Sequence, residues 1–379
     1  MINVFQPILG EDELEAIKQV FSSNWIGKGD QVSNFELNFS KSLLAKKENF
    51  CSTTSCTEGL FLAPELFNFN SEDEIIVPGI SFIAVGNSIV SSGAKMVLCD
   101  VDKRSLNARV EDIEKKITKK TKAIILNHYG GIPCDMDPIL DLCTENNIIL
   151  IEDSACAVRS FYKGKACGTM GDMGIWSFDA MKILCTGDGG MIYLKSDKLM
   201  QICREQLYLG TPAKQKSGLD SSTDNKDNWW EFDINRPGRR AIMNNIAGAI
   251  GNAQLKKLNS FIKRRKEIHG IYFNELSKYD WLRLPPMLEV DFSSSYYFFW
   301  IQLNKRNELA RYLLDNDVYS TFRYWPLNKI KYFGQTNLKL KSSDWASENT
   351  LNIPIHQSLS DDEIFKVIDL IRIFGKKYF

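Results

Sequence analysis

Two carboxylates and one lysine of this sequence follow apolar runs, in positions where they are able to do chemistry. Glu152 and Asp153 end the apolar run that starts at Ile148, and Lys182 comes shortly after the run that starts at Gly174. Ligands of open α/β sheets bind beyond the carboxyl ends of the strands, so we expect these side chains to share a site. A lysine amine forms Schiff bases, and a carboxylate beside a pyridinium nitrogen keeps the ring of pyridoxal 5'-phosphate an electron sink. Lys182 and Asp153 are therefore predicted to be catalytic residues that act with this cofactor.

The other parts of such a site also have candidates. Ser177 is able to donate a hydrogen bond to a phosphate. Residues 55–60 form a small-residue turn before an apolar helix, and the first N–H groups of a helix point outward at an anion. Phe82, after the apolar run 75–78, is able to cover the face of a ring.

Taken singly, each of these features also fits a purely structural role. Lys182 fits a solvated surface lysine, Asp153 a helix cap and Phe82 a core residue. The turn at 55–57 fits an ordinary N-cap, and the glycine run at 187–190 fits a hairpin turn. Single residues leave these alternatives open.

The elements that must position these residues are short strands alternating with helices. Alternation of this kind predicts an α/β sheet, mostly parallel and covered by helices on both faces. The predicted strands are residues 74–78, 95–100, 123–129, 148–153, 174–178 and 190–194. Helical spacing of apolar residues predicts helices over 11–21, 110–117 and 136–146.

After Leu255 the alternation of short apolar runs gives way to a long charged segment, and this change predicts a second, smaller domain. We expect a large domain over residues 1–255 and a small C-terminal α+β domain over 256–379. Within the small domain, a long charged helix is predicted over 256–279, a strand over 294–303 and helices over 306–316 and 360–374, the last capped by Ser360. The polar stretch 217–228 is predicted to be a surface loop.

Composition argues against several classes of partner. Lys plus Arg and Asp plus Glu number 47 each, so no excess of positive charge attracts nucleic acid or an anionic membrane surface. The nine cysteines read as reduced, buried thiols of a cytoplasmic protein, and the three histidines lie near no metal-ligand cluster. The N-terminus has no signal-peptide pattern, and no apolar run is long enough to span a bilayer. We expect no metal.

The segments together resemble the DegT/StrS family of sugar aminotransferases, a branch of the fold-type I, aspartate aminotransferase-like pyridoxal-phosphate enzymes. The resemblance covers nearly the whole chain and is densest at the Glu-Asp pair 152–153, the Ser-Phe-x-x-x-Lys element 177–182 and the Gly-x-Gly-Gly-Met element 187–191. It implies Lys182 as Schiff base and proton shuttle and Asp153 as partner of the pyridinium nitrogen. The roles that it implies for the rest of the cofactor are Phe82 stacked on the ring and a phosphate held by Ser177 and the amides of Cys56 and Thr57.

The chain departs from the family pattern at three places. Cys156 stands where the family commonly has Gln or His beside the phenolic oxygen of the cofactor, and Cys56-Thr57 replaces a Gly-Thr pair. Arg240 replaces an Asn that reaches the phosphate of the neighbouring subunit. Arg239 and Arg240 form a cationic pair suited to a phosphate or a carboxylate, unless they belong to a solvated basic turn. The weaker candidates for substrate binding are Lys28, Arg239, Arg323 and Tyr324.

The resemblance implies an aminotransferase that works by a ping-pong mechanism. The expected donor is L-glutamate, and the expected acceptor is the keto group of a nucleotide-linked sugar for surface polysaccharide, capsule or related amino-sugar biosynthesis. A small phosphorylated ketone such as dihydroxyacetone phosphate, giving serinol phosphate, is the alternative acceptor because Arg239, Arg240 and Arg323 would be able to clamp one phosphate. A non-catalytic pyridoxal-phosphate-binding protein is the remote alternative. A nicotinamide dehydrogenase lacks support because no G-x-G-x-x-G follows the first strand. The family further implies a homodimer with shared active sites.

Overall fold

Seven strands form the main sheet of the computed structural model, which describes residues 1–212 and 233–379. The pairs that join β2 to β3, β2 to β4, β4 to β5 and β5 to β8 are parallel, and β9 runs antiparallel between β8 and β1. In spatial order the strands are β1 (Phe50–Thr53), β9 (Gly190–Leu194), β8 (Met173–Ser177), β5 (Ile149–Asp153), β4 (Thr121–Asn127), β2 (Glu74–Pro78) and β3 (Lys95–Cys99). The predicted α/β class with a mostly parallel sheet is confirmed.

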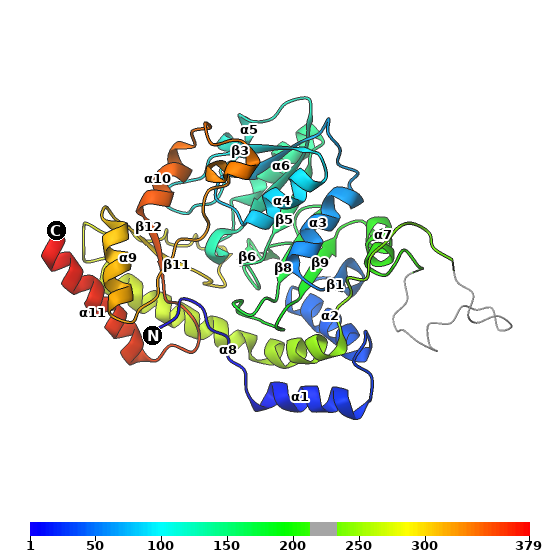
Figure 1. Ribbon diagram of the computed structural model, residues 1–379, viewed down its shortest axis with the longest axis horizontal. Coiled ribbons are helices and arrows are strands. Elements are labelled where there is room, and N and C mark those ends of the chain that lie inside the picture. Colours follow the sequence, from blue (N-terminus) through cyan, green and yellow to red (C-terminus); the bar gives the residue numbers. More distant parts are fainter. Residues whose placement is uncertain (213–232) are drawn as a thin grey trace.

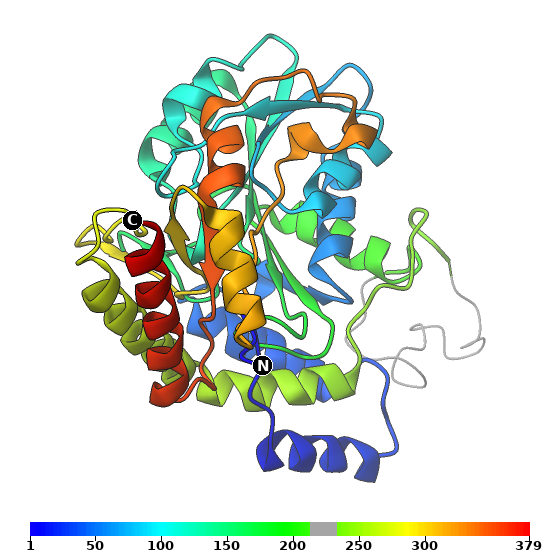
Figure 2. The ribbon, with the colours of Figure 1, turned by 60° about the vertical axis from the view of Figure 1, so that its left-hand side comes forward.

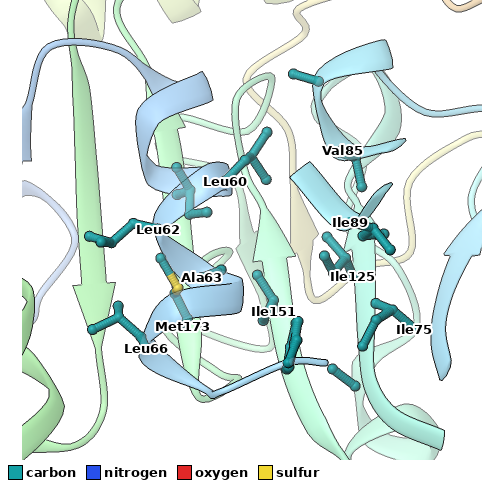
Figure 3. Packing of buried hydrophobic residues seen from close by; sticks show 14 of the residues in the cluster. Leu60, Leu62, Ala63, Leu66, Ile75, Val85, Ile89, Ile125, Ile151 and Met173 are labelled. Atoms are coloured by element: carbon teal, nitrogen blue, oxygen red, sulfur yellow. The ribbon is translucent and has the colours of Figure 1, made fainter. Parts of the chain in front are cut away.

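Helices cover both faces of this sheet, because its strands are apolar on both sides. Ile75 belongs to the same apolar cluster as Leu60 and Leu66 of α3 (Cys56–Leu66) on one face, and Figure 3 shows it near Ile89. Ile76, the next residue, points to the other face, as side chains of a strand alternate. The first face carries α3, α4 (Ile83–Ser91) and α7 (Asp197–Leu207); the second carries α2 (Asp30–Ser42), α5 (Val110–Glu114), α6 (Met136–Asn146) and α8 (Asn245–Leu276).

Helix α8 is a 32-residue rod that runs beneath the sheet and out to the C-terminal elements (Figure 1). It packs against α2 and against α1 (Glu11–Ser22). The prediction that this helix starts at residue 256 is wrong, because the helix already begins at Asn245, with Asn244 as its cap. A Cβ on Gly248 would lie 2.8 Å from Val32 N, and one on Gly251 would lie 2.7 Å from the Phe35 ring, so both glycines permit close packing on α2. A domain boundary at 255 falls inside this continuous helix, and the two-domain division stays a prediction.

The C-terminal elements gather around an antiparallel pair of strands at one end of the molecule (Figure 2). The strands are β11 (Phe299–Gln302) and β12 (Thr350–Ile353), and the helices are α9 (Arg306–Asp315), α10 (Lys341–Asn349) and α11 (Asp361–Tyr378). Ser360 caps α11 as predicted, since its side chain accepts from Glu363 N over 3.2 Å. The strand predicted over 294–303 is shorter, because Ser295 turns its hydroxyl to the Cys156 carbonyl, 2.7 Å away, and pairs with no strand.

Shorter elements connect these layers. A small sheet contains β10 (Phe292–Ser293), β6 (Phe161–Tyr162) and β7 (Lys165–Ala166). The 3-10 turns are η1 (Lys47–Asn49), η2 (Tyr129–Gly131), η4 (Leu327–Lys329) and η5 (Lys331–Phe333). Helix α5 ends at Glu114, earlier than the predicted 117. The loop predicted over 217–228 lies outside the described residues.

The two ends of the chain meet in one small core. Ile2 forms a parallel bridge with Val318, through Ile2 N to Asp317 O at 2.7 Å and Tyr319 N to Ile2 O at 2.9 Å. The side chain of Ile2 is buried in the apolar cluster that includes Ile353 and residues of α11. The first residues are therefore part of the C-terminal packing unit.

No helix within 1–212 or 233–379 combines the length and apolar character that are needed to cross a membrane. In the same described ranges, no three His, Cys, Asp or Glu side chains are grouped closely enough to hold a metal ion.

Candidate active site

The carboxyl ends of β5 and β8 and the start of α3 meet at one pocket. β5 ends at Asp153 and its neighbour β8 ends at Ser177, so the two side chains reach the same edge of the sheet. Of the residues singled out in the sequence, the pocket is lined by Cys56, Thr57, Phe82, Asp153, Ser177, Lys182, Arg323 and Tyr324. Two larger hollows, of about 630 Å³ and 480 Å³, contain neither Lys182 nor Asp153. The chemistry therefore selects the smaller pocket.

Lys182 is placed by a tight turn that follows β8. The Lys182 N–H donates to the Asp179 carbonyl over 2.9 Å, and the Asp179 carboxylate accepts from Met181 N over 3.0 Å. Its ammonium lies 4.7 Å from the centre of the Tyr297 ring and 3.8 Å from Cys156 Sγ. Burial alone would lower the pKa of Lys182, but Cys156, Tyr297, Cys56 and Asp153 favour the charged form and together raise it. The lysine is therefore held as an ammonium that must lose a proton before it reacts.

Asp153 and Glu152 are consecutive residues that face opposite sides of the sheet. Asp153 turns to the pocket, accepts from Ala155 N over 3.0 Å, and has its pKa raised by burial, against the opposing charge of Lys182. Glu152 points to the other face, where it accepts from the amides of Gly168, Met170 and Gly171 and contacts His128 Nε2 at 3.0 Å. Asp153 is thus available to a ligand, whereas Glu152 is used to hold a loop.

The start of α3 presents unused amides to the pocket. Ser55 caps the helix by accepting from Glu58 N over 3.0 Å. Within the described residues, the amides of Cys56 and Thr57 donate to no protein acceptor, as is usual for the first turn of a helix. Gly190 of β9 allows this approach, because a Cβ there would lie 2.6 Å from Ser55 C and 2.7 Å from Cys56 N. A helix start with free amides is suited to bind a phosphate group.

The rings of Phe82 and Tyr324 line the pocket, whereas Cys156, a predicted cofactor-binding residue, does not line it but contacts Tyr324 and Lys182, which do. The rings of Phe82 and Tyr324 lie 5.4 Å apart, and the Tyr324 hydroxyl lies 3.4 Å from Cys156 Sγ. Burial raises the pKa of the Cys156 thiol, and the charge of Lys182 opposes this effect. Aromatic rings of this kind are able to cover the face of a flat cofactor.

Three of the predicted basic residues lie outside this pocket in the chain. Arg239 pairs with Glu58 at 2.5 Å and Glu65 at 2.7 Å, and Arg240 lies 5.5 Å from the Tyr208 ring. The two arginines diverge because consecutive side chains of an extended segment point to opposite sides. The expected joint clamp of Arg239 and Arg240 is therefore not formed within one chain.

Lys28 is also directed away from the pocket. Burial lowers the pKa of Lys28, but the charges of Cys51 and Glu36 outweigh this effect and raise it, and the residue does not line the pocket. The loop that carries it is held by Trp25, whose indole N–H donates to the Lys28 carbonyl over 3.0 Å.

Five pocket residues were not predicted from the sequence. Ala155, Asp179, Met181 and Asp188 lie inside or beside the motifs that carry Asp153, Ser177 and Lys182, so the motifs themselves could have indicated them. Tyr297 lies more than 100 residues from those motifs and reaches the pocket by the fold alone. No spacing signal pointed to it.

The chain is similar to characterised enzymes over nearly its full length. It is 44% identical over 371 residues to dTDP-4-dehydro-2,3,6-trideoxy-D-glucose 4-aminotransferase of Saccharopolyspora spinosa, covering 97% of this chain and 95% of the relative. It is 30% identical over 383 residues to GDP-perosamine synthase of Vibrio cholerae, covering 98% of each. The crystal structure of the aminotransferase TlmJ from Streptoalloteichus hindustanus superposes with a TM-score of 0.93 at 44% identity, covering 100% of this chain and 99% of that one.

Lys182 and Asp153 lie within the part of the chain that a family model matches. The model of the DegT/DnrJ/EryC1/StrS aminotransferase family matches residues 7–372. The chain therefore belongs to the DegT/DnrJ/EryC1/StrS aminotransferase family, and it is an aminotransferase whose cofactor is pyridoxal 5'-phosphate.

Proposed function

We propose that this aminotransferase transfers the amino group of an amino acid, L-glutamate, to the keto group of a nucleotide-linked sugar, for surface polysaccharide or a related amino sugar. The observation that carries the acceptor class is the 44% identity, over 97% of the chain, to an enzyme named as a dTDP-keto-sugar 4-aminotransferase. A relative named GDP-perosamine synthase and one named spore coat polysaccharide biosynthesis protein SpsC, from Bacillus subtilis, support the same class. The small phosphorylated ketone loses its support, because Arg239 is paired with Glu58 and Glu65 rather than directed to the pocket.

The donor set of the pocket fits pyridoxal 5'-phosphate. Lys182 supplies the amine that attaches the cofactor, and the Asp153 carboxylate faces it from the end of β5. The amides of Cys56 and Thr57, with the Ser177 hydroxyl, would hold the phosphate, and Phe82 would cover one ring face. When bound, the cofactor supplies an electron sink for the carbon that gains or loses the amino group.

The residues of the chain then have separate tasks. The Lys182 amine, once released from the cofactor, takes and returns the proton of the substrate carbon. Asp153 stays ionised beside a cationic ring nitrogen, because a positive charge next to a buried carboxylate stabilises its anion. The Cys156 thiol lies 3.8 Å from the lysine amine.

Arg323 is the residue that we assign to an anionic group of the substrate. Its guanidinium lines the pocket and, among the described residues, forms no ion pair with a carboxylate. A planar guanidinium binds a carboxylate or a phosphate in a bidentate manner. Tyr324 also lines the pocket and would contact the substrate beside Arg323.

The proposed enzyme is a homodimer in which each site receives Arg240 of the partner subunit at its phosphate. Large apolar side chains are exposed in and beside α1, where a second copy would cover them: Leu9, Leu14, Phe21, Trp25 and Ile26 are 42–61% exposed. Arg240 forms no ion pair within the described residues. The proposed compartment is the cytoplasm, and the nine free, buried cysteines support a reducing environment.

The acceptor is tested with enzyme that carries the aminated cofactor. It is mixed with a dTDP-linked 4-keto sugar, a GDP-linked 4-keto sugar or dihydroxyacetone phosphate, and the return of the absorbance of the lysine-bound cofactor is followed. We expect a nucleotide-linked sugar to restore the absorbance and to yield an amino sugar in the mass spectrum. A response to dihydroxyacetone phosphate alone would refute the proposal.

A further inference from the structure

The backbone of Arg323 is held on both sides by two buried polar residues. The Arg323 N–H donates to Asn352 Oδ1 over 2.8 Å, and the Tyr129 hydroxyl donates to the Arg323 carbonyl. Asn352 Nδ2 in turn donates to the Tyr129 oxygen over 3.3 Å. A flipped Asn352 amide would set its NH₂ against the Arg323 N–H, so the three hydrogen bonds fix one orientation and close a ring.

The two holding residues come from different sheets. Tyr129 follows β4 of the main sheet, and its ring lies 5.2 Å from the rings of both Phe298 and Trp300. Asn352 belongs to β12, and its backbone exchanges two hydrogen bonds with Thr321. The Tyr129 and Asn352 residues are 1% and 0% exposed, so water does not compete for their bonds. The segment that carries Arg323 is thereby tied to both sheets.

We propose that Tyr129 and Asn352 are positioning residues for substrate binding, which fix the Arg323 backbone so that its guanidinium takes a carboxylate or phosphate of the substrate. This inference rests on the proposed role of Arg323. The guanidinium itself is loosely held, since its side-chain contacts are Met181 Sδ at 3.8 Å and the Phe5 ring at 5.4 Å. Its direction therefore depends on the backbone from which it projects. Bidentate binding of an anion loses strength steeply when the fork is misaligned.

The chain offers a matched pair of tyrosines for the test. Tyr129 and Tyr162 are each 1% exposed, and each hydroxyl makes two hydrogen bonds. The Tyr162 hydroxyl bonds to Asp135 and to the amide of Asp137, neither of which lines the pocket. Both substitutions to Phe remove one buried hydroxyl and keep the ring, so they carry comparable costs in stability.

Steady-state kinetics of Tyr129→Phe and Tyr162→Phe holoenzymes separate positioning from stability. For Tyr129→Phe we expect KM to rise roughly tenfold for the substrate whose anion Arg323 holds, with kcat within about threefold. A rise in the KM of the amino acid assigns its carboxylate to Arg323, and a rise in the KM of the keto sugar assigns its phosphate. Tyr162→Phe should leave both KM values unchanged. Equal KM changes in both variants, or none in Tyr129→Phe, would overturn the inference.

A double-substitution cycle gives a readout that a purely structural role would not move. Arg323→Ala should raise the same KM, and adding Tyr129→Phe or Asn352→Ser to it should raise that KM less than about twofold further. Full additivity would show that Tyr129 and Asn352 act elsewhere. If Arg323→Ala leaves both KM values unchanged while the enzyme still aminates the keto sugar, the role of Arg323 fails and the proposed function stands.

Discussion

Lys182 and Asp153 lie in one pocket although 29 positions separate them in the sequence. Asp153 is the last residue of β5, and Lys182 sits on the turn after the adjacent strand β8. The lysine has no carboxylate within ion-pair distance among the described residues, so its amine is not locked into a salt bridge. A half-buried lysine with this freedom is suited to covalent attachment of a cofactor.

Lys182→Ala should abolish turnover while leaving cofactor binding partly intact. The variant loses both the attachment point and the proton carrier, so we expect activity to fall by roughly a thousandfold or more. The absorbance of the bound cofactor should shift to that of the free aldehyde. Lys195→Ala, at an exposed lysine, is the control and should behave as the unsubstituted enzyme. Retention of normal turnover by Lys182→Ala would remove the basis of the site assignment.

The raised pKa of Lys182 predicts a pH dependence of cofactor uptake. The neutral amine is the nucleophile, and a raised pKa makes it scarce at neutral pH. Uptake of pyridoxal 5'-phosphate by the apoprotein should therefore accelerate with rising pH, by about tenfold per unit while the pH stays below that pKa. Stopped-flow absorbance between neutral and alkaline pH measures this rate. A rate independent of pH would contradict the raised pKa.

At the scale of single residues, the sequence located most of the pocket but not its remote members. Motif order identified Lys182, Asp153 and Ser177, because neighbouring strand ends bring motif residues together. Arg239 was read as a free cation because Glu58 and Glu65, which neutralise it, lie far away in the sequence. Tyr297 was missed for the same reason. Contacts between distant segments depend on tertiary packing, which residue spacing does not encode.

At the scale of elements, β9 and the start of α3 lie so close together that residue 190 must be a glycine if the first turn of α3 is to keep its position. A Cβ at this position would overlap the backbone between Ser55 and Cys56, at 2.6–2.7 Å. Backbone cannot move aside as a side-chain tip can. The first turn of α3 would have to shift away from β9.

Gly190→Ala should accordingly weaken cofactor binding by at least about tenfold, because a misplaced helix start loses hydrogen bonds to the phosphate. Fluorescence titration of the apoprotein with pyridoxal 5'-phosphate gives the Kd. Gly270→Ala is the matched control, since a Cβ there meets nothing within 4 Å and the residue lies in α8. That control should keep the Kd and gain roughly 0.5–1 kcal/mol of stability. An unchanged Kd for Gly190→Ala would mean that α3 does not hold the phosphate.

The length of the apolar runs and their alternation with helices predicted the parallel strands of the main sheet. Two other elements could not be predicted from their own sequences, because tertiary contacts determine them. β1, with the sequence Phe-Cys-Ser-Thr, is short and half polar, and it is a strand because it pairs with β9. The first third of α8 contains two glycines, which lower helix propensity, yet packing on α2 makes it helical. Tertiary contacts outweighed local propensity in both cases.

For the molecule as a whole, His356 links stability to acid. Burial lowers the pKa of His356 from 6.5 to about 4, with nearby Arg265 acting in the same direction and Glu363 opposing it. Between pH 4 and pH 6.5, His356 is largely protonated in the unfolded chain but largely neutral in the folded chain. Stability therefore rises with pH through this window, by at most about 1.4 kcal/mol per unit from this group, and is unaffected by it above 6.5.

His356→Asn should flatten the fall in stability between pH 6.5 and pH 4 relative to the unsubstituted protein. Urea unfolding at several pH values, with the midpoint followed by tryptophan fluorescence, measures the difference. His269, whose pKa burial also lowers to about 4, keeps its own contribution in both proteins and serves as an internal reference. Parallel pH curves for the two proteins would show that His356 does not titrate in this range.

The bridge between Ile2 and Val318 has a consequence for the order of events during translation. A ribosome adds roughly 5–20 residues per second, so the partner of Ile2 emerges roughly 15–60 s after Ile2 itself. Throughout that interval the first residues have no place to dock, although the strands of the main sheet are already available to one another. The nascent chain is therefore expected to complete its large sheet first and to form the bridge between Ile2 and Val318 as a later step.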